Sequence, residues 1–220
     1  MRELPIDHVF YGLNRNYYGT ILCDAPWRYE TWNKPTAIPR GRSGGTNVSA
    51  DVHYSTMTTD EIAALPVLDL ATEDCCLFMW ATWPMLKAAM RVIEAWSFSY
   101  KTCAFDWMKG NGSQIDMFRD DLDTHMGMGF WTRANSEPCL LATRGKPKRS
   151  NADVRMGIFE PRRQHSRKPD CVYERIERLV VGPRVELFAR TERSDWSSWG
   201  NETSKFKAPS FGTQGEELLT

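Results

Sequence analysis

The stretch Ile21-Leu22-Cys23-Asp24-Ala25-Pro26-Trp27 organises the interpretation of this chain. Its apolar residues predict a strand at about 20–24, which runs into an acidic residue, a proline turn and an indole that we expect to be exposed. A carboxylate beside a flat aromatic surface suits a planar ligand with a polar edge, such as a nucleobase. The same residues are also typical of a plain strand-ending turn in which the tryptophan covers the core, and this stretch alone does not distinguish the two.

Length and composition indicate one globular domain. The chain has 220 residues, of which 41% are hydrophobic and 25% charged, which is ordinary for a protein with a single well-buried core. The 28 basic and 28 acidic residues cancel, so any surface that binds nucleic acid must be local. No apolar run reaches the ~18 residues of a membrane span, and the N-terminus has no apolar signal core. We therefore expect a cytoplasmic protein that does not contact a membrane.

The cysteines predict buried free thiols and no metal site. They lie mostly inside apolar runs, form no C-x-x-C pair and have no histidine at metal-ligand spacing. The six positions are Cys23, Cys75, Cys76, Cys103, Cys139 and Cys171.

Periodicity predicts strands that alternate with helices. Strands are expected at 20–24, 75–81, 100–108, 138–143 and 185–188. Helices are expected after a capping box formed by Thr58 and Glu61, from Pro84, and from Pro169. Two stretches without periodicity, 30–53 and 109–135, are predicted to be long loops, and the composition from Thr203 onward predicts a flexible tail over 203–220. The alternation indicates an α/β fold with a largely parallel sheet, whose ligands lie at the carboxyl ends of its strands.

A second set of residues points to the same sheet edge. Lys168 stands at the entrance of the helix that begins at Pro169, Glu186 lies in the following strand, and Asn201 comes later. A lysine can bind an α-carboxylate and a carboxylate can bind ribose hydroxyls, as a cofactor made of an amino acid and a nucleoside requires. Each residue also has a plain alternative: a solvated charge, an edge residue and a turn.

The ordered set of motifs resembles the MT-A70 family of S-adenosylmethionine-dependent N6-adenine methyltransferases, in its bacterial or phage type. The resemblance runs from Ile21 to Glu202, which we take as a single domain over 1–202. The matching motifs are Asp24-Ala25-Pro26-Trp27 for the family's Asp-Pro-Pro-Trp, His53-Tyr54-Ser55-Thr56-Met57, Leu77-Phe78-Met79-Trp80, Glu137-Pro138-Cys139-Leu140-Leu141, Ser166-Arg167-Lys168-Pro169, Glu186-Leu187-Phe188-Ala189-Arg190 and Gly200-Asn201-Glu202.

The resemblance implies a Rossmann-like methyltransferase fold in circularly permuted order, with helices on both faces of the sheet. It implies that Asp24 and the backbone carbonyl of Ala25 or Pro26 hold the adenine amino group, and that Trp27 stacks on the base. The residues that it assigns to S-adenosyl-L-methionine are Cys23, Asp24, Lys168, Glu186, Leu187, Phe188, Arg190, Asn201 and Glu202. Two positions depart from the family pattern: Ala25 replaces a proline, which leaves the turn less rigid, and Thr191-Glu192 replaces a polar pair.

The substrate is expected to be nucleic acid. Between Arg144 and Lys168 there are nine basic residues and two acidic ones, which favours a local binding surface, although a solvated basic face would have the same composition. The residues expected to contact substrate are Trp27, Tyr29, His53, Tyr54, Glu137, Arg144, Lys146, Lys148 and Arg149.

The kind of nucleic acid is an expectation with open alternatives. The chain is a bare core without the zinc or partner-binding segments expected of the messenger-RNA writer, which favours DNA, with RNA second. A catalytically silent nucleic-acid-binding scaffold is the alternative from another class. A homodimer or a related methyltransferase is a possible protein partner.

Overall fold

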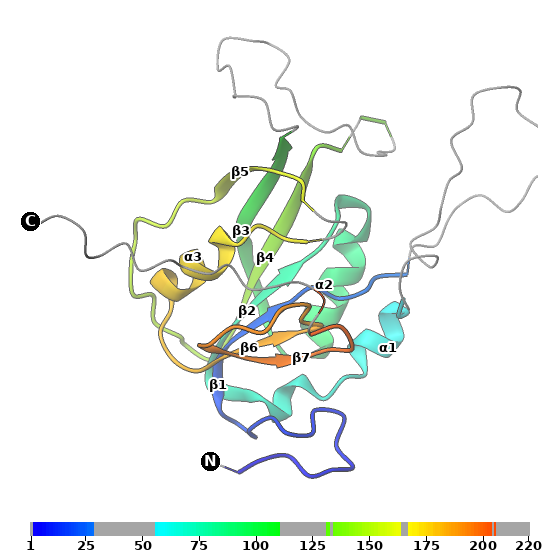
Figure 1. Cartoon of the computed structure of the whole chain (residues 1–220), viewed down its shortest axis with the longest axis vertical. Coiled ribbons are helices and arrows are strands. Elements are labelled where there is room, and N and C mark those ends of the chain that lie inside the picture. Colours follow the sequence, from blue (N-terminus) through cyan, green and yellow to red (C-terminus); the bar gives the residue numbers. More distant parts are fainter. Residues whose placement is uncertain are drawn as a thin grey trace, which may run out of the picture.

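The computed structural model describes residues 2–28, 56–110, 131–132, 134–163, 167–203 and 205. Their centre is a seven-stranded sheet with the strand order β5-β3-β4-β2-β1-β6-β7 (Figure 1). The strands are β1 (Tyr18–Cys23), β2 (Ala71–Trp80), β3 (Ser99–Gly110), β4 (Ser136–Arg144), β5 (Gly157–Pro161), β6 (Arg184–Leu187) and β7 (Trp196–Trp199).

The sheet is mixed but largely parallel, as predicted. β1 pairs in parallel with β2 and β6, β6 with β7, and β3 with β5. β4 is the exception, because it runs antiparallel to both β2 and β3. The start of β4 therefore lies at the edge of the sheet where β1, β2, β3 and β6 end.

Helices cover both faces, which confirms the α/β prediction. The helices are α1 (Thr59–Ala63), α2 (Leu86–Ala95), α3 (Cys171–Leu179) and the 3-10 turns η2 (Val67–Asp69) and η3 (Trp83–Met85). The predicted capping box is present at α1: the Thr58 hydroxyl accepts from the amide of Glu61, whose carboxylate accepts from the amide of Thr58. Figure 1 shows α3 on the opposite side of the sheet from α1 and α2.

The strand alternation builds two apolar clusters, one on each face. Ile21 and Cys23 of β1 pack with α2, which buries Ala89, Val92 and Ile93. Leu22 faces the other way and packs with Val172 and Ile176 of α3. Asp24, next along the chain, follows this alternation and emerges on the α3 side.

Some elements differ from the sequence prediction. β5 and β7 were not expected, and β3 continues through Lys109 and Gly110, which had been assigned to a loop. The predicted loop 30–53, most of the loop 109–135 and nearly all of the tail 203–220 lie outside the described residues. All six cysteines carry free thiols, as predicted; four are buried, whereas Cys103 and Cys171 are half-buried. Among the described residues, no helix is long and apolar enough to span a membrane.

Candidate active site

Asp24 lies where four strands end and one begins. It directly follows β1, and its amide donates to the carbonyl of Leu187 at the end of β6 across 3.4 Å. β2 ends beside β1, with Met79 opposite Cys23. Glu137, near the start of antiparallel β4, is opposite Trp107 near the end of β3. Parallel strand ends thus bring together residues that are far apart in the sequence, as expected for an α/β fold.

Two cations hold the carboxylate of Asp24. Lys168 Nζ is 2.8 Å from Oδ1, and Arg190 Nη2 is 3.1 Å from Oδ2. The side chains of all three are between 11% and 14% exposed, so solvent weakens these ion pairs little. The sequence prediction placed all three in one site, and the structure brings them into direct contact.

Glu137 is the second carboxylate bound by Lys168. Its Oε1 lies 3.1 Å from Lys168 Nζ, and its Oε2 lies 2.6 Å from Lys109 Nζ. Burial raises the pKa of Glu137, but the charges of Lys168 and Lys109 outweigh that effect and the pKa is lowered. Glu137 is therefore ionised near neutral pH. Lys109 was missed because it lies in the last part of β3, where the sequence periodicity ends and a loop was predicted.

Lys168 is fixed by its surroundings as a charged group. Burial alone would lower its pKa, but the carboxylates of Asp24 and Glu137 more than compensate and raise it. Its Nζ also lies 5.5 Å from the ring centroid of Trp80, at the end of β2, within the range of a cation–π contact. Lys168 therefore joins β1, β2 and β4 at the base of the site.

Glu186 is a buried carboxyl whose direct hydrogen-bond partner is a hydroxyl group. Its two oxygens accept from the hydroxyl of Tyr173 on α3, at 2.9 and 3.0 Å. Burial raises the pKa of Glu186 to about 7, with a further upward contribution from Asp24. Glu186 consequently changes its charge near neutral pH. Tyr173 lies in the helix predicted from Pro169, and nothing in the sequence indicated its bond to Glu186.

Trp27 is buried, so the expectation of an exposed indole is wrong. Its side chain packs in the α2-side cluster with 5% of its surface exposed. Its Nε1 donates to the carbonyl oxygen of Trp80 across 3.2 Å, and Trp27 also forms a β-bridge with Met57. The indole has this position because the contact with β2 provides both apolar cover and a hydrogen-bond acceptor.

The backbone carbonyls of Ala25 and Pro26 are both engaged within the turn. The amide of Trp27 donates to Ala25 across 2.9 Å, and the amide of Met57 donates to Pro26 across 2.8 Å. A carbonyl oxygen has two lone pairs, so each can still accept from a ligand. The side chains of Cys23 and Leu187 are fully buried, which leaves only their backbone for the predicted cofactor contacts.

The segments after β6 and β7 approach each other closely. Phe188 has a positive φ of 61°, which is strained for a residue with a side chain and is common at functional sites. The amide of Ala189 donates to the carbonyl of Trp199 across 2.9 Å. A Cβ on Gly200 would lie 2.8 Å from the backbone N and O of Ala189, so the backbone contact requires glycine. Asn201 is exposed beside this contact, and Glu202 pairs with Lys205.

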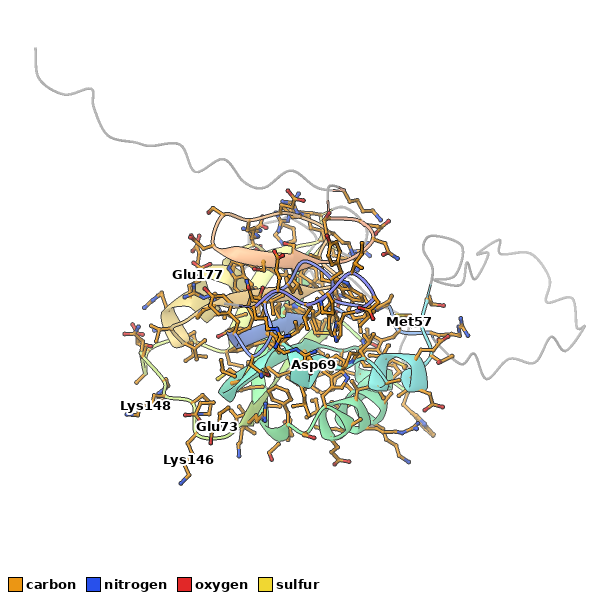
Figure 2. All side chains as sticks on the ribbon, turned by 90° about the horizontal axis from the view of Figure 1, so that it is seen from below. Met57, Asp69, Glu73, Lys146, Lys148 and Glu177 are labelled. Carbon is orange, nitrogen blue, oxygen red and sulfur yellow. The ribbon has the colours of Figure 1, made fainter. Side chains whose placement is uncertain are left out.

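Four of the predicted substrate residues lie away from this edge. Arg144 ends β4, opposite Cys75, and Lys146, Lys148 and Arg149 follow it. They therefore lie at the far edge of the sheet from Asp24, and Figure 2 shows Lys146 and Lys148 at the periphery near Glu73. This placement separates them from any base held at Asp24. Tyr29, His53 and Tyr54 lie outside the described residues.

Comparison with known proteins agrees with this geometry. A sequence model of the MT-A70 family matches residues 18–202, which include every strand of the sheet. The chain belongs to the MT-A70 family. The α/β sheet with helices on both faces is its Rossmann-like methyltransferase fold, and MT-A70 proteins are generally S-adenosylmethionine-dependent.

The individual relatives of this MT-A70 chain include a type II methyltransferase and N(6)-adenosine-methyltransferases. The type II methyltransferase M.MunI of Mycoplasma sp is 32% identical, over 96% of this chain and 88% of that protein. A putative N(6)-adenosine-methyltransferase MT-A70-like protein of Medicago truncatula is 30% identical over 85% of this chain, and the human N(6)-adenosine-methyltransferase catalytic subunit METTL3 is 26% identical over 84%. The match spans only 26% and 28% of those two proteins.

Proposed function

We propose that this protein transfers a methyl group from S-adenosyl-L-methionine to the 6-amino nitrogen of adenine in DNA. The observation that carries the proposal is the carboxylate of Asp24, fixed at the end of β1 between Lys168 and Arg190. Such a carboxylate can accept hydrogen bonds from an amino group while its own position stays fixed. Membership of the MT-A70 family supports the reaction class.

The residues at this edge have the chemistry that the cofactor requires. The cofactor has an α-carboxylate, an α-ammonium, a ribose and an adenine. Lys168 and Arg190 can bind the carboxylate, and Asp24 and Glu186 offer acceptors for the ammonium and the ribose hydroxyls. Phe188 offers an aromatic face, and Asn201 and Glu202 follow the close contact at Gly200. When bound, the cofactor supplies an electrophilic methyl group on a sulfonium.

Asp24 and one neighbouring carbonyl prepare the amino group. The lone pair of the adenine amino nitrogen is delocalised into the ring, so this nitrogen is a poor nucleophile. Asp24 and the carbonyl of Ala25 or Pro26 can accept hydrogen bonds from the two N–H groups of this nitrogen. The nitrogen then moves toward tetrahedral geometry, and its lone pair is released from the ring. A carboxylate has about four lone-pair sites, and the ion pairs of Asp24 leave acceptor capacity for this bond.

The positions of the reacting atoms contribute more to the rate of methyl transfer than the basicity of Asp24 does. The nitrogen becomes acidic once it carries the methyl group, so its surplus proton leaves to solvent and Asp24 need not be a strong base. Holding the reacting atoms in line is worth about 7–11 kcal/mol, against about 1–3 kcal/mol for stacking of a base on an aromatic ring. Trp27 is buried, so we propose that it acts as a wall of the base pocket rather than as a free stacking platform.

DNA is the preferred substrate and RNA is the second candidate. M.MunI, a type II methyltransferase, matches along most of its own length, whereas the adenosine methyltransferases match over about a quarter of theirs. An adenine in a duplex must be extruded to reach Asp24, at a cost of a few kcal/mol. A silent scaffold is disfavoured because Asp24, Lys168, Glu137 and Arg190 form a complete network of ion pairs.

Transfer of tritium from labelled cofactor tests the proposal. The purified chain is incubated with matched DNA and RNA oligonucleotides that contain adenine, and with the same oligonucleotides in which adenine is replaced by N6-methyladenine. We expect label in unmethylated DNA only. Label in RNA alone would mean that RNA, and not DNA, is the substrate. No label in either nucleic acid, with the cofactor bound normally, would favour the non-catalytic scaffold or a missing methyltransferase partner.

A further inference from the structure

Asp170 gathers three arginines beside the active site. Arg163 and Arg193 donate to its two carboxylate oxygens, Oδ2 and Oδ1, and Arg167 donates to Oδ2 across 3.2 Å. The three arginines come from the segment before Pro169 and from the segment after β6. Burial raises the pKa of Asp170, but the three guanidinium groups outweigh burial and lower it. The residue is therefore a charged centre that joins two separate segments.

One branch of this network reaches Lys168. Arg163 bonds Asp170 through Nη1 and donates to the backbone carbonyl of Lys168 through Nη2, across 2.9 Å. The backbone of Lys168 is thus held by a guanidinium that Asp170 orients. Since Lys168 Nζ bonds both Asp24 and Glu137, a shift of its backbone would move the ammonium relative to the reacting edge.

The other branch reaches Glu186. Arg193 bonds Asp170, and its guanidinium carbon lies 3.7 Å from the ring centroid of Tyr173, which is a close cation–π stack. The hydroxyl of Tyr173 donates to the carboxylate of Glu186. The ring of Tyr173 is thus held on one side by Arg193, and this orientation points its hydroxyl at the end of β6.

A plain helix cap does not explain Asp170. It is the N-cap residue of α3, where an aspartate ordinarily accepts from the first free amides of the helix. Here the N-cap has helical φ and ψ angles, and its side chain makes no capping hydrogen bond. The carboxylate is directed to the arginines instead.

We propose that Asp170 is a positioning residue that couples the two halves of the active site, Lys168 through Arg163 and Glu186 through Arg193 and Tyr173. The inference rests on the proposed function, because it assigns both ends of the network to cofactor and substrate binding. Asp170 itself takes no part in the reaction. Its role is to hold Lys168 and Glu186 in one fixed geometry before ligands bind.

The first test replaces the charge of Asp170 and leaves its shape. Asp170→Asn weakens the charge-assisted contacts with all three arginines, and Asp153→Asn is the matched control, because Asp153 forms an exposed pair with Arg178. Calorimetry of cofactor binding, steady-state kinetics and thermal unfolding are measured for both. We expect about tenfold weaker cofactor binding and a lower kcat for Asp170→Asn, and wild-type values for the control. Wild-type binding and turnover in Asp170→Asn would overturn the proposal, whatever the change in Tm.

The second test separates the branches and has a readout that a purely structural role would not change. Arg193→Gln removes a charge that lowers the pKa of Glu186, so the pH midpoint of cofactor binding should rise by about one pH unit. Arg163→Gln should weaken binding without moving this midpoint. An unchanged midpoint in Arg193→Gln would overturn the Glu186 branch. The charged and titratable groups that face Glu186 are Cys23, Asp24, Tyr173, Arg190 and Arg193.

Failure of the proposed function would be recognised separately. If the wild type binds no cofactor or transfers no methyl group, the proposed function fails. The pH dependence of unfolding still reports the pKa of Glu186 in that case, so comparison of wild type with Arg193→Gln and Asp170→Asn would decide whether the network controls Glu186. No difference among the three proteins would reject the coupling.

Discussion

The indole nitrogen of Trp27 donates to the carbonyl oxygen of Trp80 across 3.2 Å, and this bond ties the turn after β1 to the end of β2. Met57 binds the same turn through the carbonyl of Pro26. Ala25 stands where relatives with the Asp-Pro-Pro-Trp motif have a rigid proline, and these two tertiary bonds restrict the turn in its place. The carbonyls proposed to hold the adenine amino group are therefore held by these hydrogen bonds together with the one proline ring that remains, that of Pro26.

Trp27→Phe should destabilise the protein and lower turnover. The phenyl ring keeps most of the apolar contact but leaves the buried carbonyl of Trp80 without this donor, which costs about 1–3 kcal/mol. Urea unfolding measures the change. Trp83→Phe is the control, because the indole of Trp83 is 46% exposed and donates to Ser136; it should lose less than about 0.5 kcal/mol. Equal losses of unfolding free energy in both variants would show that the hydrogen bond to Trp80 contributes no more to stability than the exposed one of Trp83.

Asp24→Asn should abolish methyl transfer while cofactor affinity stays within about tenfold, because most proposed cofactor contacts lie elsewhere. The amide keeps the size of the side chain but carries no charge, so both ion pairs are lost: one cation can still donate to the amide oxygen, and the other faces an NH₂ group. Lys168 retains Glu137 as a partner, which limits the structural damage. Tritium transfer and calorimetry measure the two quantities. Turnover at the wild-type rate would remove Asp24 from the mechanism.

Lys168→Ala should weaken cofactor binding by about 10–100-fold, the equivalent of one hydrogen bond to a charged group. The structure adds a second consequence, because Asp24 and Glu137 lose a shared counter-charge. Lys148→Ala, at the far edge of the sheet, is the control and should bind cofactor normally. Normal affinity of Lys168→Ala with a low kcat would instead mean that Lys168 acts on Asp24 and not on the cofactor.

The direction of β4 explains why two sets of residues that the sequence analysis assigned to substrate lie far apart. Apolar periodicity predicted β1, β2, β4 and β6, but a period of two does not reveal whether a strand runs with or against its neighbours. Because β4 is antiparallel, Glu137 at its start joins the site and Arg144 at its end is carried to the opposite edge. The basic run after Arg144 was assigned to substrate because of its surplus of positive charge, and charge alone does not reveal at which end of the sheet a segment lies.

Contacts between segments that are distant in the sequence explain the other differences between the predicted and the observed structure. Trp27 is buried by β2, Tyr173 meets Glu186 across α3 and β6, and Lys109 meets Glu137 across two strands. None of these pairs has a local signature. β5 and β7 are short edge strands, whose pairing depends on neighbours already being in place. The strand-end motifs were predictable because parallel topology collects them at one edge.

Gly200→Ala should destabilise the segment after β7 and weaken cofactor binding. The added Cβ would lie 2.8 Å from the backbone of Ala189, so the turn that contains Phe188 must shift, at a cost of about 1–3 kcal/mol. Gly110→Ala is the control, because a Cβ there meets no atom within 4 Å. Thermal unfolding and calorimetry distinguish the variants. A Gly200→Ala protein with wild-type Tm and affinity would contradict this tight approach.

Glu186 should make the protein less stable as the pH rises through neutrality. Burial raises the pKa of Glu186 from 4.5 to about 7, so between these values the folded state holds a proton that the unfolded chain has released. The stabilisation is fully present below about pH 4.5 and is lost as the pH rises through about 7, with a total on the order of 3 kcal/mol. Asp170 and Glu137 have lowered pKa values, so they titrate below this window.

Glu186→Gln isolates this effect, because glutamine resembles the protonated carboxyl and can still accept from Tyr173. The free energy of unfolding of both proteins is measured in urea between pH 5 and pH 8. The two curves should diverge as the pH rises from about 5 to about 7, because the wild type loses stability relative to the variant there, and they should run parallel from about pH 7 to pH 8. Parallel curves over the whole range would mean that Glu186 is already ionised in the folded state at pH 5. The carboxylate would then be solvated more than its burial beside Tyr173 allows.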